Sequence, residues 1–158
     1  MKQTLAALQE NIDNGIIKVI KHTDSELIIR SHCPEDNDTM LGLAMCIYNE
    51  EGTIIVTGDD FWDLSLDTID FTMQHERAHV LYGHRIETNS VKHEIEADMY
   101  GVLTLGKDVA IKALYEIKDK VKNYMPKTER LKHIIETSAR ETSIEMLIER
   151  INYIKGVN

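Results

Sequence analysis

The chain changes character after Gly58, and this change limits the folds that are open to it. Before that point, runs rich in β-branched residues predict short strands, and the last two are joined by a turn at 49–52 that predicts a hairpin. From about residue 67 onward the apolar residues recur at helical spacing. We expect strands at 16–20, 27–29, 43–48 and 53–56, and helices over the first dozen residues and at 67–86, 91–105, 107–123, 128–136 and 140–155.

Strands followed by helices are typical of the α+β class. We expect a small, mostly antiparallel sheet followed by two helices and then a helical C-terminal region. The length of 158 residues fits a single domain over 1–158, with the strands and the first two of these helices in 1–105 and a helical subdomain in 106–158. Pro34 and the acidic stretch at 35–38 predict a surface loop.

The charge is divided unevenly along the chain. Residues 1–104 hold 7 Lys+Arg and 19 Asp+Glu, a net charge of -12, whereas residues 105–158 hold 11 and 8, a net charge of +3. Sequence-independent binding of nucleic acid requires lysine and arginine at the phosphates, so nucleic acid is not an expected partner. This exclusion is firm for the acidic residues 1–104 and weaker for the basic residues 105–158. The basic run from Lys107 to Lys132 is interpreted as a solvated face, and the alternative is that it docks an acidic substrate or the acidic part of the chain itself.

The composition also indicates where the protein works. No window has the roughly 18 apolar residues of a membrane span, and the polar N-terminus has no export signal, so we expect a cytoplasmic protein with no membrane partner. Cys33 and Cys46 have no CxxC pairing. We therefore expect reduced thiols that fill the core.

The most informative stretch is His75-Glu76-Arg77-Ala78-His79. Two histidines four residues apart lie on one face of a helix, where both imidazoles can bind one metal ion. Glu76 follows the first histidine and can reach a water on that metal as a general base. The pattern therefore predicts metal-assisted hydrolysis.

A catalytic zinc site needs a third protein ligand and an open fourth position. Glu94 and Asp98 lie on the next predicted helix and, being four residues apart, share one face. One of them can bind the metal, while the other accepts the spare N–H of a ligating histidine. Glu96 lies about 200° around the same helix from Glu94 and is expected to face away.

The remaining histidines have weaker claims on the metal. If the first metal-site helix continues, His84 points about 180° from His75, which favours a capping role or a place behind the ligands. His93 lies about 100° from Glu94 and is a minor candidate for the metal. His22, His32 and His133 are interpreted as surface residues.

These residues resemble a known group of enzymes. The stretch 75–79 followed by Glu94-x-x-Ala97-Asp98 resembles the gluzincin zinc metallopeptidases. Small size and N-terminal strands are similar to the ImmA/IrrE-like peptidases, which cleave intracellular repressors. Residues 83–84, 94–101 and 126–131 resemble the CAAX prenyl protease/HtpX-like peptidases, which are usually embedded in membranes.

The resemblance implies a zincin-like fold and assigns a role to each residue of the motif. His75, His79 and Glu94 would be ligands of Zn²⁺, Glu76 the general base, and Asp98 the residue that supports His75. Met125 stands before Pro126 where the prenyl protease group has histidine. The resemblance therefore names no oxyanion partner, and among the candidates Arg130, Tyr124, Tyr115 and His133 we favour Arg130.

Two further segments have alternative interpretations. The strand at 53–56 could be the sheet edge beside the site, where an extended peptide would pair with it, or a packed hairpin arm. The cluster at 61–63 could form a wall near the substrate, although Trp62 is more simply a core residue.

The sequence thus predicts an intracellular zinc metallopeptidase that acts on a protein or peptide, such as a repressor-like regulator. The alternative is a non-catalytic metal-binding regulatory or interaction module on the same fold. The presence of Glu76 favours the enzyme, because a structural metal does not need that carboxylate.

Overall fold

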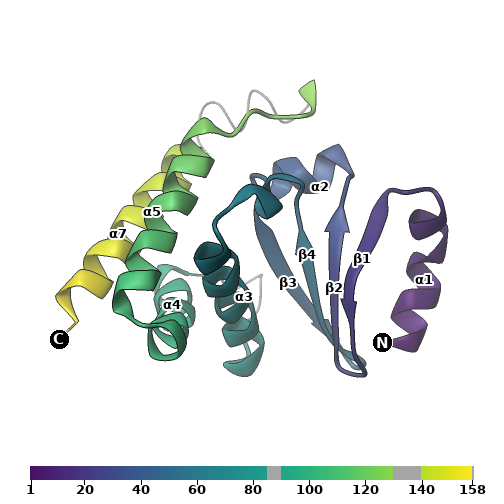
Figure 1. The fold of residues 1–158 in the computed structure, drawn as a ribbon, viewed down its shortest axis with the longest axis horizontal. Coiled ribbons are helices and arrows are strands. Elements are labelled where there is room, and N and C mark those ends of the chain that lie inside the picture. The colour runs from purple at the N-terminus through teal and green to yellow at the C-terminus, as the bar shows by residue number, and fades with distance from the viewer. Residues whose placement is uncertain (85–89, 130–139, 158) are drawn as a thin grey trace. The chain divides into compact units, whose positions relative to one another are not determined.

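The computed structural model describes residues 1–84, 90–129 and 140–157, and the chain divides into two compact units, Met1–Asp63 and Leu64–Asn158 (Figure 1). The first unit contains a four-stranded sheet and the second contains helices, so the predicted α+β class is confirmed. The predicted division at 105/106 falls inside the second unit, between two of its helices.

The sheet of the first unit has the strand order β1-β2-β4-β3. Its strands are β1 (Ile17–His22), β2 (Glu26–Ser31), β3 (Ala44–Asn49) and β4 (Gly52–Thr57). The predicted hairpin of β3 and β4 is confirmed, and β1 also pairs antiparallel with β2. β2 and β4 run parallel, however, so the sheet is mixed.

Helix α1 (Lys2–Asp13) packs against this sheet through Leu5, Leu8 and Ile12. These side chains contact a buried cluster that includes Leu27 and Ile29 of β2. The Glu51 carboxylate in the β3–β4 turn accepts hydrogen bonds from the free backbone N–H groups of Gln3 and Thr4 and so caps the helix. The Thr4 hydroxyl also donates to this carboxylate. Its hydrogen bond, together with those of the two backbone N–H groups, lowers the pKa of Glu51 to about 2.

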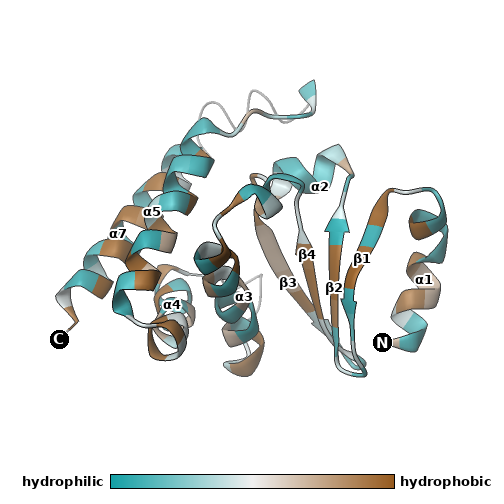
Figure 2. Cartoon of the chain, in the orientation of Figure 1, coloured by the Kyte–Doolittle hydropathy of each residue, from teal (hydrophilic) through white to brown (hydrophobic). Residues whose placement is uncertain are grey.

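The prediction that the strand at 53–56 forms the sheet edge is wrong. β4 pairs with β2 on one side and with β3 on the other, so Ile55 lies between Ile28 and Cys46. Ile55 is fully buried. Apolar residues colour much of β4 brown in Figure 2, as expected for an inner strand rich in β-branched residues. With its backbone paired on both sides, β4 cannot accept an extended peptide, and the packed-hairpin interpretation is confirmed.

The prediction of a surface loop at 34–38 is also wrong, because these residues form the short helix α2 (Pro34–Thr39). Pro34 stands at its first position, where a missing N–H costs nothing, and Glu35 and Asp36 occupy the positive first turn. Asn37 is fully buried and donates through its side-chain amide to the carbonyls of Ser31 and Cys33.

The 3₁₀ helix η1 (Asp60–Asp63) ends the first unit. Phe61 is fully buried, and the Trp62 indole N–H donates to the Thr57 hydroxyl over 3.0 Å. Phe61 is therefore a core residue, whereas Trp62 is half-buried and Asp63 is exposed, so the interpretation of Trp62 as core holds only in part.

The second unit consists of α3 (Leu66–Leu81), α4 (Val91–Leu105), α5 (Lys107–Asn123) and α7 (Arg140–Gly156). The predicted helices at 91–105, 107–123 and 140–155 are confirmed, whereas the one at 128–136 lies almost entirely outside the described residues. α5 and α7 pack together, and α7 buries Leu147, Ile151 and Ile154. In the described ranges, no helix combines the length and apolar character that a membrane crossing requires.

α3 ends at Leu81, five residues before the predicted end at 86. Gly83 adopts a φ of 68° and stops the helix. The N–H groups of Gly83 and His84 bond back to the carbonyls of Val80 and His79, which is a Schellman motif. The chain therefore turns at the point where a continuing helix was expected.

α3 and α4 pack closely where Gly101 of α4 meets the Phe71 ring of α3. A Cβ atom at Gly101 would lie 2.5 Å from Cε2 of Phe71, which is far inside van der Waals contact. Phe71 is fully buried and cannot move aside freely. A residue without a side chain therefore sets the spacing of the two helices.

We predict that Gly101→Ala destabilises the protein although alanine favours helices. Overpacking costs about 1–3 kcal/mol, which exceeds the roughly 1 kcal/mol that alanine gains over glycine in a helix. Urea unfolding measures the difference. Gly156→Ala is the matched control, because open space surrounds that position in α7. Equal stability of the two variants would contradict the close packing.

Candidate metal site

Two helices with well-defined starts carry the candidate ligands. α3 begins at Ser65, whose hydroxyl accepts a hydrogen bond from the Thr68 N–H. α4 begins in the same way at Ser90, which accepts from the His93 N–H. Such caps satisfy N–H groups that have no partner within the helix and fix where it starts.

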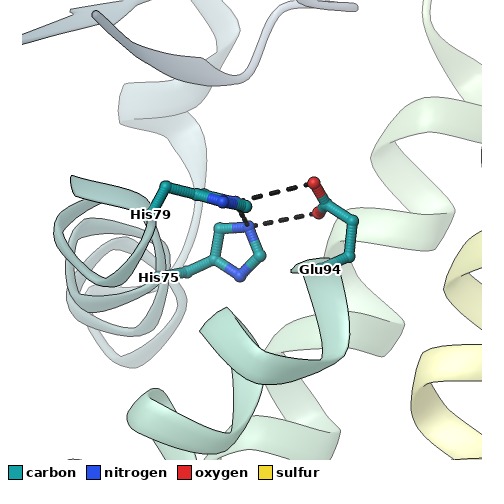
Figure 3. Close-up of side chains that lie close together, drawn as sticks. All are labelled: His75, His79 and Glu94. Carbon is teal, nitrogen blue, oxygen red and sulfur yellow. Dashed lines mark hydrogen bonds and ion pairs between the residues drawn. The ribbon is translucent and has the colours of Figure 1, made fainter. Parts of the chain in front are cut away.

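His75 and His79 of α3 and Glu94 of α4 point toward one another (Figure 3). The two Nε2 atoms are 2.9 Å apart. The Glu94 carboxylate lies 3.2 Å from Nε2 of His75 and 3.5 Å from Nε2 of His79. All three side chains are buried, and their three donor atoms converge on one point in space.

This arrangement fits a metal ion. Ligands at about 2.0–2.1 Å from a tetrahedral ion lie roughly 3.3 Å from each other, close to the three measured separations. Two imidazoles and a carboxylate form a donor set that suits a first-row divalent ion such as zinc. The predicted set His75, His79 and Glu94 is thus brought together in a cluster that could hold a metal ion.

Asp98 lies directly behind His75. Its Oδ1 atom is 2.8 Å from Nδ1 of His75, on the side of the ring opposite the converging Nε2 atom. Asp98 is fully buried. The contact places the proton of a neutral His75 on Nδ1 and leaves the Nε2 lone pair for a metal, which is the supporting role predicted for Asp98.

Arg150 of α7 is the residue that sequence reasoning missed. Its Nε and Nη2 atoms each donate to the Asp98 carboxylate over 2.7 Å, and its Nη1 atom lies 3.0 Å from Glu94. Its side chain is only 11% exposed, although it carries a full charge. The available signal was an arginine within about 60° of Leu147 and Ile154, which are on the buried face of α7, but Arg140 of the same helix also meets this criterion.

Burial and neighbouring charges shift the pKa values of these groups in the metal-free protein. Burial opposes charge on His75, but hydrogen bonds with Asp98 and Glu94 outweigh it and raise the pKa of His75 to about 10. Burial and the nearby charge of His75 lower the pKa of His79 to about 4. Burial raises the pKa of Asp98, but the charge and hydrogen bonds of Arg150 outweigh it and hold that pKa below its usual range.

Glu76 lies on α3 next to His75 and is also buried. Burial opposes a high pKa of Arg150, but the charges of Asp98 and Glu94 outweigh it and raise that pKa. The charge of Glu76 makes a smaller contribution in the same direction. Glu76, Glu94 and Asp98 carry three negative charges against the single positive charge of Arg150. Histidines that bind a metal are neutral, so two negative charges would remain in the metal-bound site, and a divalent cation would cancel them.

The structure describes two of the four candidates for the oxyanion partner. Arg130 and His133 are outside the described residues. Tyr124 follows α5 and is buried, whereas Tyr115 is partly exposed and its hydroxyl accepts from Lys155 over 2.7 Å. The oxyanion partner predicted at Arg130 therefore stays a prediction.

The helical wheel predicted that Glu96 faces away from the site, but Glu96 is connected to the site through His84. Its carboxylate lies 3.0 Å from Nε2 of His84, and Nδ1 of His84 lies 3.0 Å from Nδ1 of His79. His84 therefore stands behind a ligand, as was expected for it, but the turn at Gly83 puts it there. His22 and His32 are exposed, as predicted. Cys33 and Cys46 form no disulfide bond, but both are half-buried, so the prediction that they fill the core is wrong.

We predict that Arg150→Leu destabilises the protein by about 3–5 kcal/mol, since it removes the guanidinium that donates two hydrogen bonds to the buried Asp98 carboxylate. Urea unfolding in the presence of a chelator measures this effect without metal. Glu149→Leu, at an exposed neighbouring position on α7, should change stability by no more than about 0.5 kcal/mol. A similar small effect of Arg150→Leu would show that the buried ion pair is not needed.

We compared the chain with models of protein families, with curated proteins and with solved structures, and none of these comparisons finds a match. The assignment of a function therefore depends on the geometry of the site and on the motif that builds it.

Proposed function

We propose that the chain is an intracellular zinc-dependent metallopeptidase of the gluzincin type, with a zincin-like fold. The observation that carries the proposal is the convergence of His75, His79 and Glu94, within 2.9–3.5 Å of one another, from two adjacent helices. Glu76 completes a motif in which ligands and general base occur together. A structural metal needs no such base.

The number and type of ligands favour a catalytic zinc site. Structural zinc sites use four protein ligands, usually with cysteine, whereas catalytic sites use three and leave a position open. Neither Cys33 nor Cys46 belongs to the cluster of His75, His79 and Glu94. The cluster therefore has the composition of a hydrolytic centre.

Each residue has a distinct task in the proposed reaction. A bound zinc ion supplies Lewis-acid polarisation of the scissile carbonyl. Glu76 accepts a proton from the attacking water and delivers it to the leaving amine. Asp98 fixes the ring of His75, and Arg150 holds both Asp98 and Glu94, so the site is set before the substrate arrives. Arg130 remains the proposed partner of the developing oxyanion.

The proposed substrate is an extended segment of an intracellular protein, such as a repressor-like regulator. This part of the proposal comes from the resemblance to the ImmA/IrrE-like peptidases. It does not use β4, whose backbone is already paired on both sides.

We predict that Glu76→Gln lowers the rate of peptide hydrolysis by about 10²- to 10⁴-fold, because the amide cannot accept the proton. The assay follows cleavage of a fluorescent unfolded casein and of candidate repressors, with and without a chelator. Metal content, measured by mass spectrometry, should stay near one equivalent per chain. The control is Glu145→Gln, an exposed change on α7 that should leave activity at the wild-type level.

Three results would contradict the proposal. Wild-type protein that binds no zinc would remove the metal site. Full activity of Glu76→Gln would remove the mechanism. One bound zinc without any cleavage would favour the alternative of a metal-binding module without catalysis.

A further inference from the structure

One side of the His79 ring faces away from the metal cluster. Nε2 of His79 lies beside His75 and Glu94, so the other ring nitrogen, Nδ1, points to the opposite side. There it lies 3.0 Å from Nδ1 of His84. The two ring centroids are 5.2 Å apart, with the rings tilted 66° from one another.

His84 reaches this position because α3 ends before it. Gly83 turns the chain with its positive φ, and the His84 N–H bonds to the His79 carbonyl over 2.8 Å. The backbone of His84 is therefore tied to the same residue that its ring contacts. Its side chain is only 7% exposed.

The proton positions along the hydrogen bonds from His79 to His84 and on to Glu96 follow from the proposed ligand role of His79. A neutral imidazole that binds a metal through Nε2 carries its proton on Nδ1. This proton donates to Nδ1 of His84, which must then be an acceptor. The proton of His84 is consequently on Nε2, where Glu96 Oε2 accepts it over 3.0 Å. Every member of the chain has its hydrogen-bond partner.

α4 provides the support for this arrangement. Glu96 accepts from His84, and the His93 ring stacks on the His84 ring with 4.2 Å between centroids and 18° between planes. The same helix provides Glu94 to the cluster and Asp98 to His75. Each histidine of the cluster thus has a hydrogen-bond partner behind it.

A second metal centre is the competing interpretation of His84, His93 and Glu96, whose donor atoms lie within 4.8 Å of one another. Nδ1 of His93 is buried without a hydrogen-bond partner among the described residues, as an unused ligand would be. The ring geometry opposes this, however. Lone pairs of imidazoles lie in the ring planes, so two nearly parallel stacked rings cannot direct them at one ion.

The protons oppose a second centre as well. A metal on Nε2 of His84 would place a proton on its Nδ1, directly facing the Nδ1 proton of His79. Two donors would then meet at 3.0 Å. The two sites could not both be filled without breaking this contact.

We propose that His84, held by Glu96 and His93, is a positioning residue that fixes the tautomer and ring orientation of the metal ligand His79. The inference rests on the proposed metal site at His75, His79 and Glu94. It adds a second outer support to the one that Asp98 gives His75.

The test compares three variants of His84 in the full chain. His84→Leu removes the acceptor and should weaken zinc binding by about 10- to 100-fold. His84→Asn keeps an acceptor at the position of Nδ1 and should restore most of the affinity. His84→Gln keeps contact with Glu96 but not with His79 and should behave like His84→Leu. Zinc affinity is measured by competition with a chelating dye, and His22→Leu on the exposed face of β1 is the control.

We expect a higher zinc affinity for His84→Asn than for His84→Gln and His84→Leu, an order that a merely structural role would not produce. The comparison of Asn with Gln remains valid even if His84→Leu fails to fold. The stability of the metal-free Asn and Gln variants, measured by thermal unfolding, should be equal. Equal zinc affinity of these two variants would overturn the proposal. So would two zinc equivalents in the wild type, one of which is lost in His93→Leu. A wild type without zinc would instead refute the metal site itself.

Discussion

The site depends on the ion pair between Asp98 and Arg150. Asp98 is fully buried, and a bare carboxylate there would cost several kcal/mol. Arg150 meets it with two parallel hydrogen bonds of 2.7 Å and extends a third contact to Glu94. With this pair in place, Asp98 can stay ionised and hold His75, and Glu94 can face the two histidines. The negative charge that remains at the cluster would favour the binding of a cation.

α4 organises the site from one side. It provides Glu94 to the cluster, Asp98 to the ring of His75, and Glu96 to the ring of His84. Its distance from α3 is set by the contact of Gly101 with Phe71. A small change in the packing of α4 would therefore shift Glu94, Asp98 and Glu96 together, which connects the core of the second unit to the candidate metal site.

The sequence predicted what local periodicity encodes. The four-residue spacings of His75 with His79 and of Glu94 with Asp98 placed each pair on one helix face. Arg150 could not be predicted, because it meets Asp98 across 52 residues through the packing of α7. The parallel pairing of β2 with β4 was missed for the same reason, since strand patterns do not specify neighbours. α3, which contains His79, ends earlier than predicted because Gly83 adopts a left-handed backbone conformation. Helical periodicity alone does not show where such a turn occurs.

The central claim is that His75, His79 and Glu94 hold one divalent ion. X-ray diffraction from crystals grown with zinc, recorded on both sides of the zinc absorption edge, locates the ion directly. The account predicts one anomalous peak at about 2.0–2.1 Å from both Nε2 atoms and from a Glu94 oxygen. A peak between His84 and His93 with none at this cluster, or no peak in the protein at all, would contradict it.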